Sequence, residues 1–370
     1  MARRCSSVRG LLALLLAALT LAACSAADDS GVEGPVTVYV SLPLTGPFGG
    51  DGRDAADGAR LALEQARGRA GDLEVRARYL DDARGKPWDP VAVGANARAA
   101  AQDSSTAAYI GELSSQPTRA SLPITNDAGI AQVSPGAGAI DLTEPAKGYP
   151  DSPDRYRPSG EQTFARVVPS DEELAAGAAQ LLSELGVSRA FVGADERDAW
   201  GALLTQRFRE AAEADGVEPL APSPGPLGGG EARVLFPAPV PPAEGGPAPV
   251  VLVGTEDREY ALSAAQDPQV LPQPRGAGFA ETFLNRFGRS PGAFAAYGHQ
   301  AMATVLRAIA ERDEADDGFR AGVASALLEF RGPDSLLGSF VFTEAGDSTL
   351  CRIQADESPG AGPSALCVRP

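Results

Sequence analysis

Histidine is almost absent from this sequence, and the residue patterns of common catalytic and metal-binding sites are missing as well. The only histidine among 370 residues, His299, lies in an apolar helical pattern, where a histidine is typically structural. There is no Gly-x-Ser-x-Gly segment and no set of histidines and cysteines at metal-ligand spacing. The glycine-rich segment 49–52 lacks the Lys-Ser/Thr pair of a phosphate-binding loop. We therefore expect a protein that is not an enzyme and that holds no cofactor and no metal.

Basic residues are also scarce, with 32 Lys and Arg against 49 Asp and Glu and a formal net charge of −17. An acidic surface repels phosphate backbones, so a nucleic acid is excluded as the expected partner. The acids are spread along the chain, which is typical of a solvated surface. Adjacent acids such as Asp81 and Asp82 are expected in solvated turns or at helix N-termini.

Long apolar runs are lacking near the N-terminus, where residues 11–19 form a run shorter than the roughly 20 residues needed to cross a bilayer. Three arginines precede this run, and the segment Leu21-Ala22-Ala23-Cys24 follows it. A positive start, a short apolar run and a small-residue cleavage site are typical of an export signal. The closing cysteine resembles the bacterial lipobox, which implies that residues 1–23 are removed and that Cys24 carries lipid. A transmembrane anchor is the less favoured alternative.

Cysteine is rare, with four in the chain. Cys5 is lost with the signal, and Cys351 and Cys367 remain close together near the C-terminus. In an oxidising compartment these two favour one disulfide over two free thiols. No third or fourth ligand lies nearby, so a zinc site is not expected.

The body of the chain alternates between short apolar segments and helical patterns, which predicts βαβ units and parallel sheets. A proline-rich stretch at residues 145–160 predicts a crossing, after which the alternation restarts. The Pro/Gly-rich interval 219–249 is expected to be loop with one short strand. Strands are predicted at 36–40, 73–80, 107–110, 130–133, 164–168, 189–192, 250–253 and 339–342. Helices are predicted at 53–67, 91–101, 115–127, 171–185 with Ser170 as its cap, 198–215, 279–287, 298–312 and 319–330.

Six segments in order resemble the type I periplasmic binding proteins of the leucine/isoleucine/valine-binding family. They are Pro43-Leu44-Thr45-Gly46-Pro47 with Gly58-Ala59-Arg60-Leu61-Ala62; Asp81-Asp82 with Asp89-Pro90; the segments 110–115 and 128–135; Phe164 to Asp171; Ala296 to Ala301; and Gly338 to Asp347.

This resemblance implies an α/β protein with two doubly wound parallel-sheet lobes joined by a hinge. The expected organisation is a signal peptide at 1–23, a tether at 24–35, lobe 1 at 36–160 plus 290–337, and lobe 2 at 161–289 plus 338–370. The second lobe is expected to be trimmed, because the family segment after residue 265 is missing.

The resemblance also implies a ligand between the lobes, at the carboxyl ends of the strands. Ser115 matches the residue that holds the ligand's carboxylate, and Ser114 precedes it, although helix capping is an alternative role for both. Gly136 matches a position whose backbone carbonyl meets the ligand. Gly138 lies where amino-acid binders have a threonine, and the absence of that hydroxyl weakens an amino-acid interpretation. The candidates in the second lobe are Trp200, Thr255 and Glu256.

The function that follows is a lipid-anchored substrate-binding protein on the extracytoplasmic side of the cell membrane. It is expected to bind an amino-acid-like or related small carboxylate and to deliver it to the permease of an ABC importer. Two alternatives stay open: a ligand-sensing receptor domain without a transporter, and a degenerate binding protein with no transport role.

Overall fold

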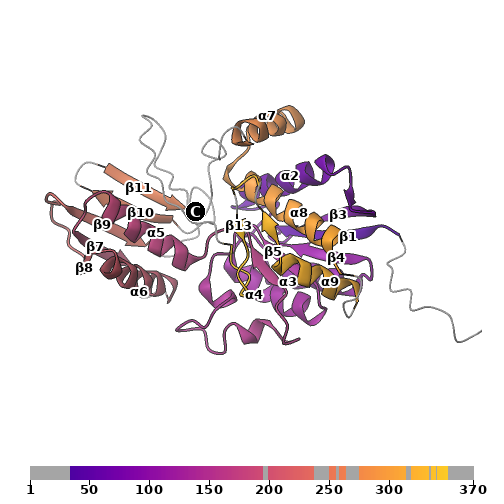
Figure 1. The fold of residues 1–370 in the computed structure, drawn as a ribbon, viewed down its shortest axis with the longest axis horizontal. Helices are drawn as coiled ribbons and strands as arrows, with labels where there is room; N and C mark the ends of the chain where they lie inside the picture. Colours follow the sequence, from indigo (N-terminus) through magenta and orange to yellow (C-terminus); the bar gives the residue numbers. More distant parts are fainter. Residues whose placement is uncertain are drawn as a thin grey trace, which may run out of the picture. The chain divides into compact units, whose positions relative to one another are not determined.

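The computed structural model describes residues 34–194, 199–236, 250–255, 258–263, 275–313, 318–332, 335–338 and 340–348 (Figure 1). The predicted lipid site at Cys24, the candidate Glu256 and the cysteine pair Cys351 and Cys367 lie outside the described residues. Their roles therefore remain predictions.

The first sheet has six strands in the order β2-β3-β1-β4-β5-β6. All pairings are parallel except that of β2 with β3, a short antiparallel hairpin. Every residue of β1 and β4 is buried, as expected of parallel strands covered on both faces. The strands are β1 (Val36–Leu42), β2 (Arg69–Ala70), β3 (Leu73–Asp81), β4 (Thr106–Ile110), β5 (Ala131–Ser134) and β6 (Phe164–Arg166).

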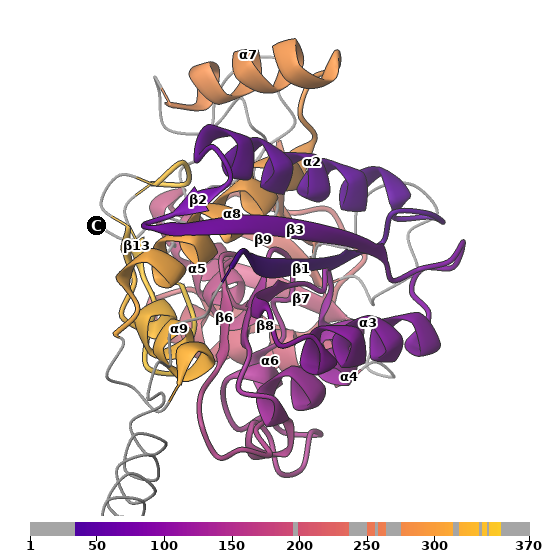
Figure 2. The same cartoon turned by 90° about the vertical axis from the view of Figure 1, so that its right-hand side faces the viewer.

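Helices cover both faces of this sheet. Figure 2 shows α2 (Gly49–Gln65) on one side of β1 and β3, and the pair α3 (Pro90–Gln102) and α4 (Ser115–Asp127) on the other. Helix α2 packs closely on α8 (Ala293–Glu311), where a Cβ atom on Gly58 would stand 1.9 Å from the Ala295 carbonyl oxygen. Helix α9 (Phe319–Leu328) packs beside α8. The predicted doubly wound arrangement is confirmed.

The second sheet has five strands in the order β11-β10-β9-β7-β8. Strands β7 (Arg189–Ala194), β8 (Glu218–Leu220) and β9 (Glu231–Phe236) are parallel, whereas β10 (Val250–Thr255) and β11 (Arg258–Ser263) run antiparallel to their neighbours. Helices α5 (Asp171–Glu184) and α6 (Ala199–Ala214) contribute to the core on this sheet. That core includes Leu182, Val192, Leu204, Phe208 and Val234.

The remaining elements are short or peripheral. They are the 3-10 turns η1 (Ile140–Leu142) and η2 (Asp154–Tyr156), the helix α7 (Arg275–Phe287), and the two-stranded pair β12 (Arg331–Gly332) and β13 (Phe340–Val341). Within the described ranges, none of the helices has the length and apolar character that a membrane crossing requires.

Several sequence predictions can be compared directly with these elements. The α/β class with two sheets is confirmed, and so is the cap of α5: the Ser170 hydroxyl accepts from Glu173 N, and the Glu173 carboxylate accepts from Ser170 N. The interval 219–249 contains the short strand expected there, β9, together with the end of β8. Two details differ. The second sheet is mixed rather than parallel. Strand β6 completes the first sheet, whereas the sequence assigned it to the second lobe; the lobe boundaries themselves remain a prediction.

Candidate functional site

Four of the predicted ligand contacts lie in two neighbouring loops at the carboxyl ends of β4 and β5. Ser114 is the N-cap of α4 and Ser115 its first residue, and the buried Gly136 and Gly138 follow β5. The Ser115 hydroxyl accepts a hydrogen bond from Ala139 N at 3.0 Å, which ties the start of α4 to the loop after β5. The structure therefore brings these four residues into one region of the first sheet.

The N-terminus of α4 is open to an acceptor. Ser114 adopts an extended N-cap conformation, but its side chain makes no capping hydrogen bond, so its hydroxyl does not serve the expected capping role. The first amides of a helix and its dipole both favour a negative group. The Ser115 hydroxyl, which accepts from Ala139 N, still has its own proton to donate.

Three of the four amides in the segment 136–139 have partners. The Ser134 hydroxyl accepts from Gly136 N at 3.2 Å and from Ala137 N at 2.8 Å. The third amide, that of Ala139, donates to Ser115.

Three of the four carbonyls of the same segment also have partners. Arg166 Nη1 donates to the carbonyl oxygens of Ala137 and Ala139, each at 2.9 Å, and Asp171 N donates to that of Gly138 at 2.8 Å. Among the described residues, the Gly136 carbonyl and the Gly138 N–H make no hydrogen bond. A buried loop thus keeps one acceptor and one donor available, and buried backbone groups without partners are unusual in folded proteins.

Both glycines are also required by close packing. A Cβ atom on Gly136 would stand 2.2 Å from the Leu113 carbonyl oxygen, and one on Gly138 would stand 2.6 Å from Asp171 Oδ1. Residue 138 therefore offers a ligand its backbone only, and a threonine at this position would not fit without a shift of Asp171.

A small pocket of about 10 Å³ lies beside Ser114, a volume of roughly one water molecule. Most of the residues that line this pocket are apolar, and one lining residue is the acid Asp82. The lining residues are Pro43, Phe48, Asp82, Pro87, Trp88, Leu113, Ser114 and Pro117.

Asp82 belongs to a buried pair of acids with Glu112, which corrects the expectation of a solvated turn. The two residues are 1% and 0% exposed, and the Tyr109 hydroxyl donates to Glu112 Oε1 at 2.6 Å. Burial raises the pKa of Asp82 to about 7. Burial, followed by the charge of Asp82, raises the pKa of Glu112 well above its ordinary value. The pair therefore retains a proton near neutral pH.

The candidates of the second lobe are not brought together in the same way. Trp200 is the second residue of α6, which follows β7, but its side chain is outside the description. Thr255 ends β10 and pairs with Ala232, near the start of β9, and β9 runs parallel to β7. Thr255 therefore lies at the edge of the sheet where β7 begins, opposite the edge from which α6 follows. The expectation that Thr255 lies at the ligand edge assumed a parallel β10, and the antiparallel pairing contradicts it.

Two residues that sequence reasoning missed as site residues are Arg166 and Asp171. Both were noted as part of one motif, but their contacts with the segment 136–139 depend on the tertiary fold. No group of three or more His, Cys, Asp or Glu among the described residues is arranged to hold a metal ion.

A family model described as "Periplasmic binding protein" matches residues 35–235, more than half of the chain, so this chain belongs to that family. No curated protein matches the sequence.

Solved structures of the type I periplasmic binding fold share this architecture. A leucine-binding protein of Thermotoga maritima is 19% identical with a TM-score of 0.62, covering 90% of this chain and 99% of that one. A branched-chain amino acid substrate-binding protein of Streptococcus pneumoniae, in complex with isoleucine, is 14% identical with a TM-score of 0.63, covering 91% and 100%. An ABC transporter solute-binding protein of R. palustris, in complex with benzoate, is 16% identical with a TM-score of 0.61, covering 90% and 98%. At these identities the likeness shows the fold.

Proposed function

We propose that this protein is the lipid-anchored, extracytoplasmic substrate-binding component of an ABC importer and that it binds a small carboxylate. The observation that supports the ligand class is the pair of backbone groups without partners, the Gly138 N–H and the Gly136 carbonyl, beside the open start of α4. Structural relatives that carry isoleucine or benzoate support the same class, since both ligands have a carboxylate.

The hydrogen-bonding groups of this site match a ligand that has a carboxylate at one end and a hydrogen-bond donor at the other. The Gly138 N–H, the Ser115 hydroxyl and the first amides of α4 supply donors for a negative group. The Gly136 carbonyl supplies an acceptor for an ammonium or a hydroxyl. Because residue 138 is a glycine, the site lacks the threonine hydroxyl that would accept a hydrogen bond from a ligand's ammonium. This favours amino-acid-like acids whose binding does not depend on a contact between their ammonium and residue 138.

The transport role is supported by the family and by the N-terminal sequence. An export signal that is cleaved before Cys24 would place the mature protein outside the cytoplasmic membrane, where lipid on Cys24 would tether it. A permease in that membrane is then the expected partner. Replacement of Cys24 by Ser should move the protein from the detergent phase to the aqueous phase when cells are extracted with a phase-separating detergent; unchanged partitioning would exclude lipidation at Cys24.

Matched pairs of ligands test the carboxylate assignment. Calorimetric titration should detect binding of benzoate or L-isoleucine. The amides benzamide and L-isoleucinamide, in which an uncharged amide replaces the carboxylate, should bind at least tenfold more weakly, because they cannot supply the negative group. If the amide of a bound acid binds as tightly as the acid, or if neither acid binds, the proposed ligand class is wrong.

A further inference from the structure

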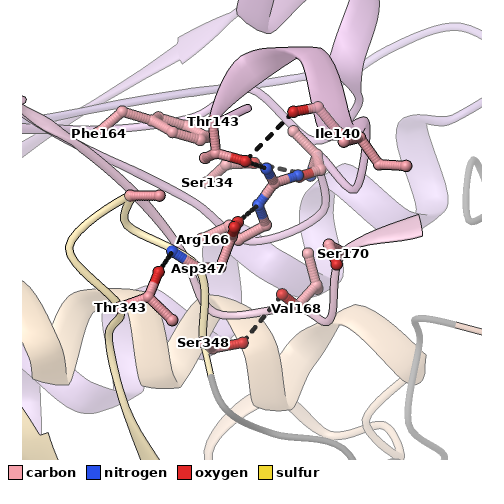
Figure 3. A network of polar contacts seen from close by, with 12 residues as sticks. Ser134, Ile140, Thr143, Phe164, Arg166, Val168, Ser170, Thr343, Asp347 and Ser348 are labelled. Atoms are coloured by element: carbon pink, nitrogen blue, oxygen red, sulfur yellow. Dashed lines mark hydrogen bonds and ion pairs between the residues drawn. The ribbon is translucent and has the colours of Figure 1, made fainter. Parts of the chain in front are cut away.

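Arg166 is a fully buried charged side chain near the candidate site. It is 0% exposed and lies at the end of β6, and Figure 3 shows its guanidinium among groups from three segments. Nη1 donates to the carbonyl oxygens of Ala137 and Ala139, Nη2 donates to the Thr143 hydroxyl, and Nε donates to Asp347 Oδ1 at 2.6 Å. One side chain thus joins the loop after β5 to the segment that carries Asp347.

The planarity of the peptide bond gives these contacts a consequence for the ligand site. In a trans peptide the carbonyl of one residue and the N–H of the next point in opposite directions. Because the Ala137 carbonyl is directed at Arg166, the Gly138 N–H must point away from Arg166. The same relation directs the Gly136 carbonyl away from Ser134, which accepts the hydrogen bond of Ala137 N.

We propose that Arg166 is a positioning residue for ligand binding: it fixes the Ala137–Gly138 peptide plane so that the Gly138 N–H faces the ligand's carboxylate. This inference rests on the proposed function for its ligand, but the orientation of the peptide plane can be measured without one. Arg166 itself, fully buried behind the loop, does not contact the ligand.

Asp347 holds Arg166 in place from a distant part of the chain. It belongs to the segment 340–348, where its backbone N–H donates to the Thr343 hydroxyl at 3.1 Å, and the adjacent Ser348 hydroxyl donates to the Val168 carbonyl at 3.0 Å (Figure 3). A guanidinium paired with a carboxylate on one side keeps its remaining donors in a fixed plane. Asp347 therefore contributes to the same positioning.

The double variant R166M/D347N tests the proposal, because it removes both charges and leaves no unpaired ion in the interior. The control is R119M/D141N, which removes a second ion pair in which Asp141 is buried and Arg119 partly buried, with Arg119 Nη2 2.5 Å from Asp141 Oδ1. Neither Arg119 nor Asp141 makes a described hydrogen bond to the backbone of residues 136–139. Both variants should lose stability, so a fall in melting temperature alone does not distinguish them.

The decisive measurement is the ¹⁵N order parameter of the Gly138 amide in the ligand-free protein. It should be near 0.85 in the wild type and in R119M/D141N, and should fall below about 0.6 in R166M/D347N. The dissociation constant for benzoate or L-isoleucine, whichever the wild type binds, should rise about tenfold in R166M/D347N alone.

A rigid Gly138 amide in R166M/D347N, or an equal loss in the control, would overturn the positioning role. If the wild type binds neither acid while the order parameter behaves as expected, the carboxylate assignment fails and the role of Arg166 in fixing the peptide plane stands. If the order parameter falls but the dissociation constant of a bound acid is unchanged, Gly138 is not a ligand contact and the proposal is wrong.

Discussion

Asp171 Oδ1 lies 2.6 Å from the point where a Cβ atom on Gly138 would stand, and Asp171 N donates to the Gly138 carbonyl at 2.8 Å. The first residue of α5 is therefore packed against the loop that follows β5. Asp171 occupies the space that a side chain at residue 138 would need. Residue 138 can therefore contribute only its backbone to the candidate site.

Replacement of Gly138 by Ala should destabilise the protein by about 1–3 kcal/mol, because the new methyl group would overlap a buried carboxylate. Urea unfolding measures this loss. The matched control is Gly278→Ala in α7, where nothing lies within 4 Å of a new Cβ and alanine favours the helix. Combining Gly138→Ala with Asp171→Ala should recover part of the loss if the overlap is the cause. A double variant whose losses simply add would show that the overlap does not determine the cost.

Replacement of Ser115 by Ala should weaken the binding of a carboxylate ligand by about 1–3 kcal/mol, since it removes a donor to the ligand and the acceptor of Ala139 N. Calorimetric titration with the acid that the wild type binds measures the effect. Ser325→Ala is the matched control, because Ser325 is exposed on α9 and is not a predicted ligand contact. Equal affinity of wild type and Ser115→Ala would remove Ser115 from the site.

The buried acids predict an unusual dependence of stability on pH. A carboxyl whose pKa is raised by folding stabilises the native state fully below its unfolded pKa, and this contribution is lost as the pH rises through the folded value. The unfolding free energy should therefore contain a component that declines from about pH 4 to about pH 7, where Asp82 titrates.

The variant Asp82→Asn removes one charge while keeping the shape of the side chain. It should raise the unfolding free energy at pH 8 by about 1–3 kcal/mol and flatten the decline between pH 4 and 8. Urea unfolding at several pH values checks both effects. Identical pH profiles in the two proteins would mean that Asp82 is ionised without cost and that no proton is shared with Glu112.

Local patterns were sufficient to predict much of the fold. The apolar run at 107–110 and the capped helix that starts at 171 lie where the sequence places them, because burial on both faces and N-capping are local requirements. Strand β9 lies within the interval where one short strand was expected, without its bounds. Strand β11 was missed because it begins with charged residues and lacks a continuous apolar run. The antiparallel direction of β10 leaves no mark in its apolar residues, and this explains the wrong placement of Thr255.

The site could be predicted only in part, because some of its contacts depend on the tertiary fold and not on the local sequence. Ser115 follows a predicted strand and opens a predicted helix, whereas Gly138 is a candidate only through the resemblance to the binding-protein family. Arg166 is different, since its ionic partner Asp347 lies 181 residues away. Its other partners are the Thr143 hydroxyl and two backbone carbonyls, and any sequence provides carbonyls. Interactions of this kind emerge only when the tertiary fold brings the segments together.

His299 gives a last prediction, at the packed interface of α2 and α8. Its Nε2 atom lies 2.7 Å from Gln65 Oε1, its ring packs edge-on against Phe279 at 5.4 Å, and its buried Nδ1 makes no hydrogen bond with a described residue. Burial lowers the pKa of His299 to about 4, so protonation favours the unfolded chain, in which histidine titrates near its ordinary value of about 6.5. The unfolding free energy should therefore fall as the pH is lowered from about 6.5 towards 4, by up to about 3 kcal/mol.

Replacement of His299 by Gln, a neutral side chain that can still bond to Gln65, should remove most of this fall. Guanidinium unfolding of both proteins at pH 7 and pH 4.5 isolates the effect, because the carboxylates contribute equally to each. The same decrease in both would show that His299 accepts a proton in the folded state without cost.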